Sequence, residues 1–150
     1  MDYIVQSSKN LKLEIVSKDP YEKNIRKKLN FGHTIGHAIE SYLLDSNAPT
    51  LHGFAIAKGM IIESFIAKKE NLLSEDYFHE IKTVLSNKFK TYLNFTIDSK
   101  SIIKLMLSDK KNTQNTINFS LPVRIGEVTI NHELELKKVE SYLLEFFQND

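Results

Sequence analysis

The sequence predicts a mainly α-helical domain with one small β-hairpin. Glycine and proline number only 5 and 3 in 150 residues, which favours long helices over a turn-rich β fold. Apolar residues recur at helical spacing in several segments, whereas apolar and polar residues alternate only in a stretch near the C-terminus. Because 41% of the residues are hydrophobic and no linker divides the chain, we expect residues 1–150 to form a single domain with its own core.

Five helical segments are expected before the hairpin. They cover Tyr3–Val16, Leu29–Leu44, Leu51–Lys69, Ser74–Lys88 and a short segment that begins at Asp98 or Ser99 and carries Ile102, Ile103, Leu105 and Met106. The first break follows from Pro20, which disfavours helix at Asp19 and suits a new first turn. Turn-forming residues in Asp45–Thr50 make the second break, and Ser74 is a suitable N-cap.

The hairpin is expected at Thr116–Ile130. The letters TINFSLP alternate apolar and polar positions, and RIGEVTI follows across Gly126, as in two short strands joined by a turn. A closing helix is expected over Glu133–Phe147, with Asn131 or His132 as its N-cap.

Composition narrows the classes of partner and location. The formal net charge of +1 gives no field that would attract nucleic acid or an anionic membrane. The absence of cysteine excludes disulfides and cysteine-based zinc sites, so a reducing cytoplasm is the expected location. The first residues do not resemble a secretory signal, and no apolar run approaches the roughly 18 residues of a membrane span.

The stretch LNFGHTIGHAIES places His33 and His37 four residues apart, on one side of a predicted helix. Two helical histidines at this spacing can share a metal ion, as in the H-E-x-x-H pattern. The metalloprotease glutamate is missing, however, since Thr-Ile-Gly lies between the two histidines.

A third histidine, His52, opens the next predicted helix. If the loop Asp45–Thr50 folds that helix back, His52 approaches the turn that carries His33, and zinc sites commonly use two or three such nitrogens. The alternative is that all three are ordinary core or surface histidines. The histidines are flanked by Gly32, Gly36 and Gly53, and small neighbours let a ligand approach the backbone closely. A metal site and ordinary histidines are therefore about equally favoured.

Polar residues precede the histidines: Lys12, Asp19, Glu22, Arg26 and Asn30. In a continuous helix Arg26, Asn30 and His33 would form one donor-rich stripe suited to a phosphate or a carboxylate. A solvated face of basic residues is the alternative, and spacing alone favours it.

The ordered motifs DPYEKNIRKKLNFGHTIGHAIES, LHGFAIAKGM and SDKKNTQNTINFSLPVRIG resemble the C-terminal domain of 3-dehydroquinate synthase. The resemblance runs from about Lys12 to the C-terminus. It implies the helical C-terminal domain of the dehydroquinate synthase-like fold.

The family resemblance implies a phosphate-eliminating carbon–oxygen lyase of the shikimate pathway, which leads to aromatic amino acids. Its substrate, the seven-carbon sugar acid phosphate DAHP, is converted to 3-dehydroquinate and phosphate. Family members use NAD, which carries a hydride, and a divalent metal such as zinc or cobalt, which acts as a Lewis acid.

The resemblance also implies roles for individual residues. His33 and His52 match metal ligands, and we expect their nitrogens to converge within about 4 Å. His37 matches a catalytic histidine that transfers a proton to the substrate or hydrogen-bonds near it. Lys12, Arg26 and Asn30 match catalytic, substrate-contacting positions. Lys110 or Lys111 matches a lysine that reaches the substrate phosphate. Asp19 and Glu22 match acids that orient these groups without contacting the substrate.

The sequence departs from the family pattern in two ways that bear on function. A third metal ligand, a glutamate, lies upstream of these residues in the family, and no glycine-rich nucleotide-binding loop occurs here. The NAD-binding N-terminal domain is therefore expected to be absent from this chain and to act as its partner. In addition, Phe54 occupies a position where the family has glutamate, which could orient a metal-bound histidine.

These departures predict weak metal affinity and no synthase activity for the chain alone. A related sugar-phosphate cyclase is an alternative function. A non-catalytic helical domain that only binds a partner is another. A homodimer is also expected, because the family is usually dimeric.

Overall fold

The computed structural model describes residues 2–93, 97–108 and 115–149, and it confirms a mainly helical fold with a two-stranded antiparallel sheet. The elements in chain order are α1 (Asp2–Lys18), the 3-10 helix η1 (Ile25–Asn30), α2 (His33–Asp45), α3 (His52–Lys69), α4 (Glu75–Phe89), α5 (Ser99–Ser108), β1 (Thr116–Arg124), β2 (Glu127–Glu135) and α6 (Leu136–Asn149). Within the described ranges, no helix combines the length and apolar character that a membrane crossing requires.

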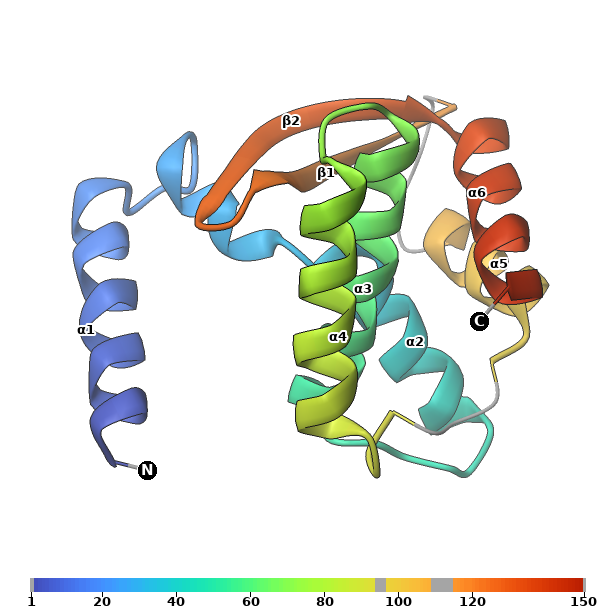
Figure 1. The fold of residues 1–150 in the computed structure, drawn as a ribbon, viewed down its shortest axis with the longest axis horizontal. Coiled ribbons are helices and arrows are strands. Elements are labelled where there is room, and N and C mark those ends of the chain that lie inside the picture. The colour runs from blue at the N-terminus through green and yellow to red at the C-terminus, as the bar shows by residue number, and fades with distance from the viewer. Residues whose placement is uncertain (1, 94–96, 109–114, 150) are drawn as a thin grey trace.

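Helix α3 is the centre of the fold. Helices α2 and α4 pack against it, and the hairpin arches over one end. Helices α5 and α6 lie together on the side opposite α1, at the right of Figure 1. The side chains of α3 are buried almost all round, from Ala55 to Ala67. The core joins α2, α3, α5, α6 and the hairpin through fully buried side chains such as Ile39, Ile62, Ile102, Ile117 and Leu143, each of which contributes about 1.5–3 kcal/mol by burial.

Helices α2 and α3 approach very closely where they cross. A Cβ atom built on Gly59 of α3 would lie 2.1 Å from the Gly32 carbonyl oxygen and 2.7 Å from the Gly36 nitrogen. A Cβ on Gly36 would lie 3.0 Å from the Ile56 Cα. Glycine is therefore required on both helices, because no larger residue allows the two backbones to touch.

Helix α1 stands away from the helical body and joins it through η1 (Figure 1). Its large apolar side chains are exposed: Tyr3, Ile4, Val5, Leu11 and Leu13.

Most of the expected helices are confirmed to within two residues at each end. Ser74 caps α4, since its hydroxyl accepts a bond from the Tyr77 N–H at 3.3 Å. Of the two caps considered for α5, Asp98 is the one observed, and its carboxylate accepts a bond from the Ser101 N–H at 2.9 Å.

The expected continuous helix over Leu29–Leu44 is wrong at its N-terminal end. Residues 25–30 form a 3-10 helix instead, and α2 begins only at His33. The break lies at Gly32, whose φ of +83° is incompatible with a right-handed helix. Arg26, Asn30 and His33 therefore do not share one helical stripe.

The expected start of the closing helix at Glu133 is also wrong, because strand β2 continues to Glu135 and α6 begins at Leu136. Asn131 and His132 are strand residues, not caps. Leu134 is buried opposite Ile117, so the inward-facing side chain stabilises the strand here. The register shifts between Phe119 and Leu121, and the facing strand contains Asn131 at a φ of +58°.

The α2–α3 crossing predicts different outcomes for two glycines of α3. Gly59→Ala should destabilise the fold by about 1–3 kcal/mol, since the new methyl group would overlap the backbone of α2. The matched control is Gly53→Ala, because nothing lies within 4 Å of a Cβ at that position. The control should be neutral or stabilising by up to about 1 kcal/mol. Urea denaturation followed by circular dichroism measures both; equal stability of the two variants would contradict the close crossing.

Candidate metal centre and substrate cavity

Three of the five histidines, His33, His37 and His52, meet where α2 begins beside the start of α3. Their ring centroids are 5.3–5.7 Å apart. One ring nitrogen of each lies within 4.8 Å of the others. Two nitrogens bound to one zinc ion at about 2.1 Å are at most about 4.2 Å apart, so small side-chain rotations complete the approach. The loop 46–51 thus brings His52 back to His33, as the sequence predicts.

The ring of His33 is held by the backbone. Its Nδ1 lies 3.2 Å from the carbonyl oxygen of Phe31. A carbonyl can only accept, so Nδ1 carries the proton and Nε2 keeps a free lone pair. Burial lowers the pKa of His33, and the neighbouring His37, His52 and Lys12 lower it further, against the opposing effect of the Phe31 bond. The neutral ring is the form that can bind a metal.

The ring of His52 is held by a carboxylate. Its Nδ1 lies 3.0 Å from Oε2 of Glu40, so Nδ1 donates to the carboxylate and Nε2 is left free. The side chain of His52 is 53% exposed, so the three-histidine cluster opens to the surface. Phe54 stacks on Tyr92 at 4.2 Å between ring centroids. The carboxylate partner observed for His52 is therefore Glu40.

A cavity of about 550 Å³ adjoins the cluster. Its lining residues are Asn30, His33, Thr34, His37, Ala38, Ser41, Leu105, Met106, Ile117 and Asn118. Polar groups come mainly from α2 and its approach, while Leu105 and Met106 of α5 and Ile117 of β1 form an apolar wall. A small polar ligand therefore has donors on one side and a dry surface on the other.

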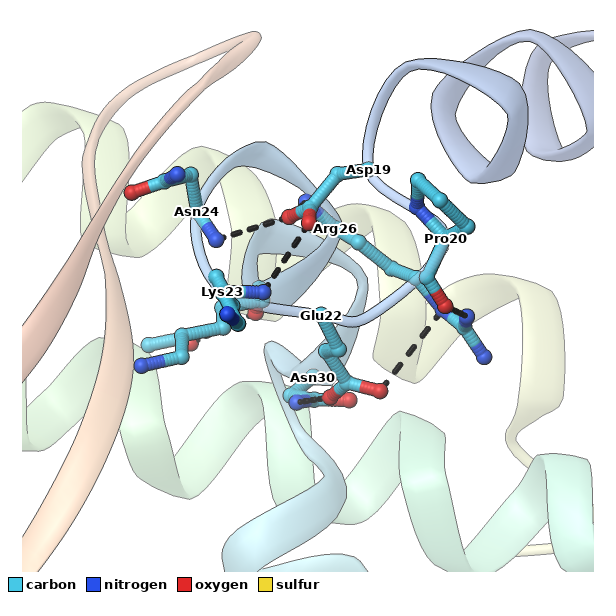
Figure 2. Close-up of polar contacts among 9 residues, drawn as sticks. Asp19, Pro20, Glu22, Lys23, Asn24, Arg26 and Asn30 are labelled. Carbon is cyan, nitrogen blue, oxygen red and sulfur yellow. Dashed lines mark hydrogen bonds and ion pairs between the residues drawn. The ribbon is translucent and has the colours of Figure 1, made fainter.

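The turn before η1 is organised by Asp19, which is buried (Figure 2). Its carboxylate accepts the backbone N–H groups of Lys23 at 2.9 Å, Asn24 at 2.7 Å and Arg26 at 3.1 Å. Burial alone would raise the pKa of the Asp19 carboxyl, but these three donors, with the charge of Arg26, hold that pKa below its ordinary value. Asp19 therefore supports the segment that carries the next polar residues.

Glu22 contacts two of the polar residues that follow it, Asn30 and Arg26. Its carboxylate accepts the Asn30 side-chain amide at 2.6 Å and lies 3.6 Å from Nε of Arg26. The Arg26 guanidinium also donates to the Pro20 carbonyl at 2.9 Å (Figure 2). Glu22 thus contacts both Asn30 and Arg26; its role as a supporting acid stays a prediction.

The sequence-predicted site residues are not all brought together. Asn30, His33 and His37 line the cavity, and the ring of His52 lies against the rings of His33 and His37. Arg26 and Lys12 are not among the described residues that line the cavity. Lys12 still lies close enough for its charge to lower the pKa of His33. The two lysines expected at a substrate phosphate, Lys110 and Lys111, lie outside the described residues.

A sequence profile described as 3-dehydroquinate synthase C-terminal matches residues 1–112. The chain belongs to this family. It is 39% identical over 141 residues to the 3-dehydroquinate synthase of Thermodesulfovibrio yellowstonii, with 91% of this chain and 38% of the relative covered. It is 34% identical over 139 residues to the enzyme of Parabacteroides distasonis, with 93% and 39% covered. The chain thus spans about two fifths of the length of these relatives.

Solved structures of related cyclases share the fold. A 2-deoxy-scyllo-inosose synthase, crystallised with carbaglucose-6-phosphate, NAD+ and Co2+, superposes with a TM-score of 0.76 at 28% identity over 89% of this chain and 38% of its own. A 2-epi-5-epi-valiolone synthase from Streptomyces hygroscopicus, with NAD+ and Zn2+ bound, gives a TM-score of 0.71 at 20% identity over 92% of this chain and 38% of its own. The second likeness concerns the fold alone.

Sequence reasoning missed two acidic residues that contact the histidine cluster or the start of α2. Glu40 follows His33 and His37 at helical spacings of i+7 and i+3, which is the signal that could have placed it beside them. Glu63 is a single acid within the apolar run of α3, and a carboxylate in a helix buried all round requires a partner. Its bonds go to the N-terminus of α2.

Asp19 predicts how the stability of the fold depends on pH. Its pKa is lower in the folded chain than its ordinary value of 3.8, so its contribution is complete above that value and is lost as the pH falls through the folded pKa. Asp19→Asn should destabilise the chain at pH 7 and reduce the further loss between pH 7 and pH 3. Urea denaturation at both pH values measures this, and an unchanged acid-induced loss in the variant would contradict it.

Proposed function

We propose that this chain forms the metal- and substrate-binding part of a 3-dehydroquinate synthase, which converts DAHP to 3-dehydroquinate and phosphate. One observation carries the proposal. Three imidazoles converge beside a cavity of about 550 Å³, and the two assigned to the metal have their Nδ1 atoms engaged elsewhere, which leaves Nε2 free. Family membership makes this the chemistry that the site supports best.

The donor set fits a divalent metal ion. We assign His33 and His52 as ligands, because a carbonyl and a carboxylate fix the tautomer of each ring. Imidazole nitrogens suit zinc and cobalt, and Co2+ is present in the crystallised 2-deoxy-scyllo-inosose synthase. When bound, the ion supplies Lewis acidity toward the reacting oxygens of the substrate.

The other groups bind and orient an anionic sugar. Asn30 lines the cavity, and its side-chain amide donates to Glu22, which fixes its position. We assign Arg26 and Lys12 to the carboxylate and phosphate of DAHP, with Lys110 or Lys111 at the phosphate. His37, an exposed ring on the cavity wall, is assigned proton transfer to the substrate.

The nicotinamide cofactor is assigned to a separate nucleotide-binding region that pairs with this chain, since these 150 residues contain no glycine-rich phosphate loop. NAD supplies the reversible hydride transfer that acidifies the neighbouring C–H bond. A cytoplasmic location and a homodimer stay predictions.

A related sugar-phosphate cyclase is the second candidate, favoured by the structural likeness to the 2-deoxy-scyllo-inosose synthase. The two candidates differ in whether the substrate carries a carboxylate. Arg26, which shares the Glu22 carboxylate with Asn30, favours the acid-bearing substrate, because a guanidinium binds a planar carboxylate well.

A domain that only binds a partner is favoured by one observation, the exposed apolar side chains of α1. The same surface is compatible with the synthase, since a pairing half would cover it. The histidine cluster has no role in a purely structural partner, so the synthase is preferred.

Metal binding is the direct test of the candidate centre. Co2+ should bind the chain in a 1:1 ratio, and His33→Ala should lower its affinity at least 10-fold. His37→Ala should lower it less if the ring acts mainly on the substrate. The matched control is His79→Ala on α4, an exposed histidine 3.0 Å from Glu75, which should leave affinity unchanged. Isothermal titration calorimetry and the cobalt absorption spectrum measure this; equal losses in the His33 and His79 variants would contradict the assignment.

Phosphate release tests the reaction. The chain alone, with NAD, Zn2+ and DAHP, should release no phosphate above background, because the hydride acceptor has no site. Addition of a nucleotide-binding half from a family member should restore release, and replacement of DAHP by a hexose 6-phosphate should not. Release from the hexose phosphate but not from DAHP would favour the related cyclase, and no release with either would favour the partner-binding domain.

A further inference from the structure

Glu63 is an acidic residue in an apolar environment. It lies in the middle of α3, its side chain has 0% exposure, and its helical neighbours Ile62 and Ile66 are fully buried as well. A carboxylate in such surroundings is unfavourable by several kcal/mol unless it accepts strong hydrogen bonds. Burial of an apolar side chain at this position would be more favourable in free energy, so the carboxylate requires a specific explanation.

The carboxylate of Glu63 reaches across the close α2–α3 crossing to the start of α2. Oε2 accepts the backbone N–H of Gly32 at 2.6 Å, and Oε1 accepts that of Ile35 at 3.0 Å. Gly32 is the N-cap and has no side chain to satisfy these donors, so Glu63 acts in place of an N-cap side chain. Its charge also lies at the positive end of the helix dipole.

The bond to Gly32 has a consequence for His33. The N–H of Gly32 and the carbonyl of Phe31 belong to one planar peptide unit and point in opposite directions. That same carbonyl accepts the Nδ1–H of His33 at 3.2 Å. Glu63 therefore holds one end of a peptide unit whose other end holds the imidazole ring, and the two bonds strengthen each other.

We propose that Glu63 is a positioning residue for the metal centre. It fixes the Phe31–Gly32 peptide and, through it, the orientation and Nδ1–H tautomer of His33, so that Nε2 is left free to bind a metal ion. The metal part of this inference rests on the proposed function; the effect on the His33 tautomer does not. Both of its bonds to α2 go to backbone N–H groups, so Glu63 acts on the metal centre through the backbone.

We call the connection from Glu63 through the Phe31–Gly32 peptide to His33 the relay. Glu63→Gln tests the relay, because the amide has the same shape but can accept only through its one oxygen. It loses one of the two acceptors and presents an N–H group to a backbone N–H. The matched control is Ser64→Ala, which removes a buried hydroxyl from the adjacent position of α3 whose bond goes to Met60 of the same helix. Both variants remove a buried polar contact, but only Glu63→Gln removes one that reaches α2.

Two measurements on the 150-residue chain are needed. Long-range 1H–15N spectra of the imidazole rings report the tautomer of each histidine without any metal present. We expect the Nδ1–H form of His33 to dominate in the wild-type chain and in Ser64→Ala, and to give way to a mixture in Glu63→Gln. Isothermal titration with Co2+ should give about 10-fold weaker binding for Glu63→Gln than for Ser64→Ala.

The outcomes separate the two proposals. A tautomer change in Glu63→Gln with no Co2+ binding to the wild-type chain would uphold the relay and remove the metal centre. Co2+ binding with an unchanged His33 tautomer and equal affinity in both variants would uphold the metal centre and overturn the relay. If Glu63→Gln does not fold, the wild-type chain decides. A through-hydrogen-bond coupling between the Gly32 nitrogen and the Glu63 carboxylate carbon, together with the Nδ1–H form of His33, supports the relay, and the absence of either overturns it.

Discussion

The contact between the backbones of α2 and α3 is the constraint on which the rest of the structure depends. Three histidines on two helices can meet only if the helix axes are close at the point where their rings project. Gly59 against Gly32 and Gly36 provides that closeness, because a single added carbon atom would lie 2.1 Å from the Gly32 oxygen. The same proximity lets a side chain from the interior of α3 reach the first turn of α2. The same glycines therefore allow the two helices to pack closely and bring the three histidines together.

Two of the histidine rings and the turn before Asn30 are each fixed by a hydrogen-bond acceptor. A backbone carbonyl fixes His33, the Glu40 carboxylate fixes His52, and the buried Asp19 fixes the turn that precedes Asn30. Proteins preorganise a site by fixing its functional groups through hydrogen bonds of this kind. The cavity is then bounded on its other side by apolar residues of α5 and β1.

Sequence alone predicted the elements that depend on local pattern and short loops. The helical stripes, the Ser74 cap and the return of His52 toward His33 all follow from periodicity or from turn residues between neighbouring helices. The break at Gly32 was missed because apolar spacing continues across it, and only the positive φ reveals it. Strand β2 was ended too early because the burial of Leu134 depends on a partner strand. Glu63 was missed because its partners lie on α2, and spacing along α3 does not identify them. Glu40 was missed although its spacing from His33 and His37 places it on their side of α2, because its partner His52 lies on α3.

The short polar network of residues 19–30 has a consequence for the order of folding. Its hydrogen bonds join residues that are at most eight positions apart, from Asp19 to Lys23 up to Glu22 to Asn30. The bonds that dock this segment onto the hairpin, from Lys27 to Ser120 and Asn131, span 93 and 104 positions. Closing the longer loops is less favourable by about 2 kcal/mol of chain entropy. The segment that presents Arg26 and Asn30 can therefore close early, while its docking onto the hairpin waits for distant parts of the chain to meet.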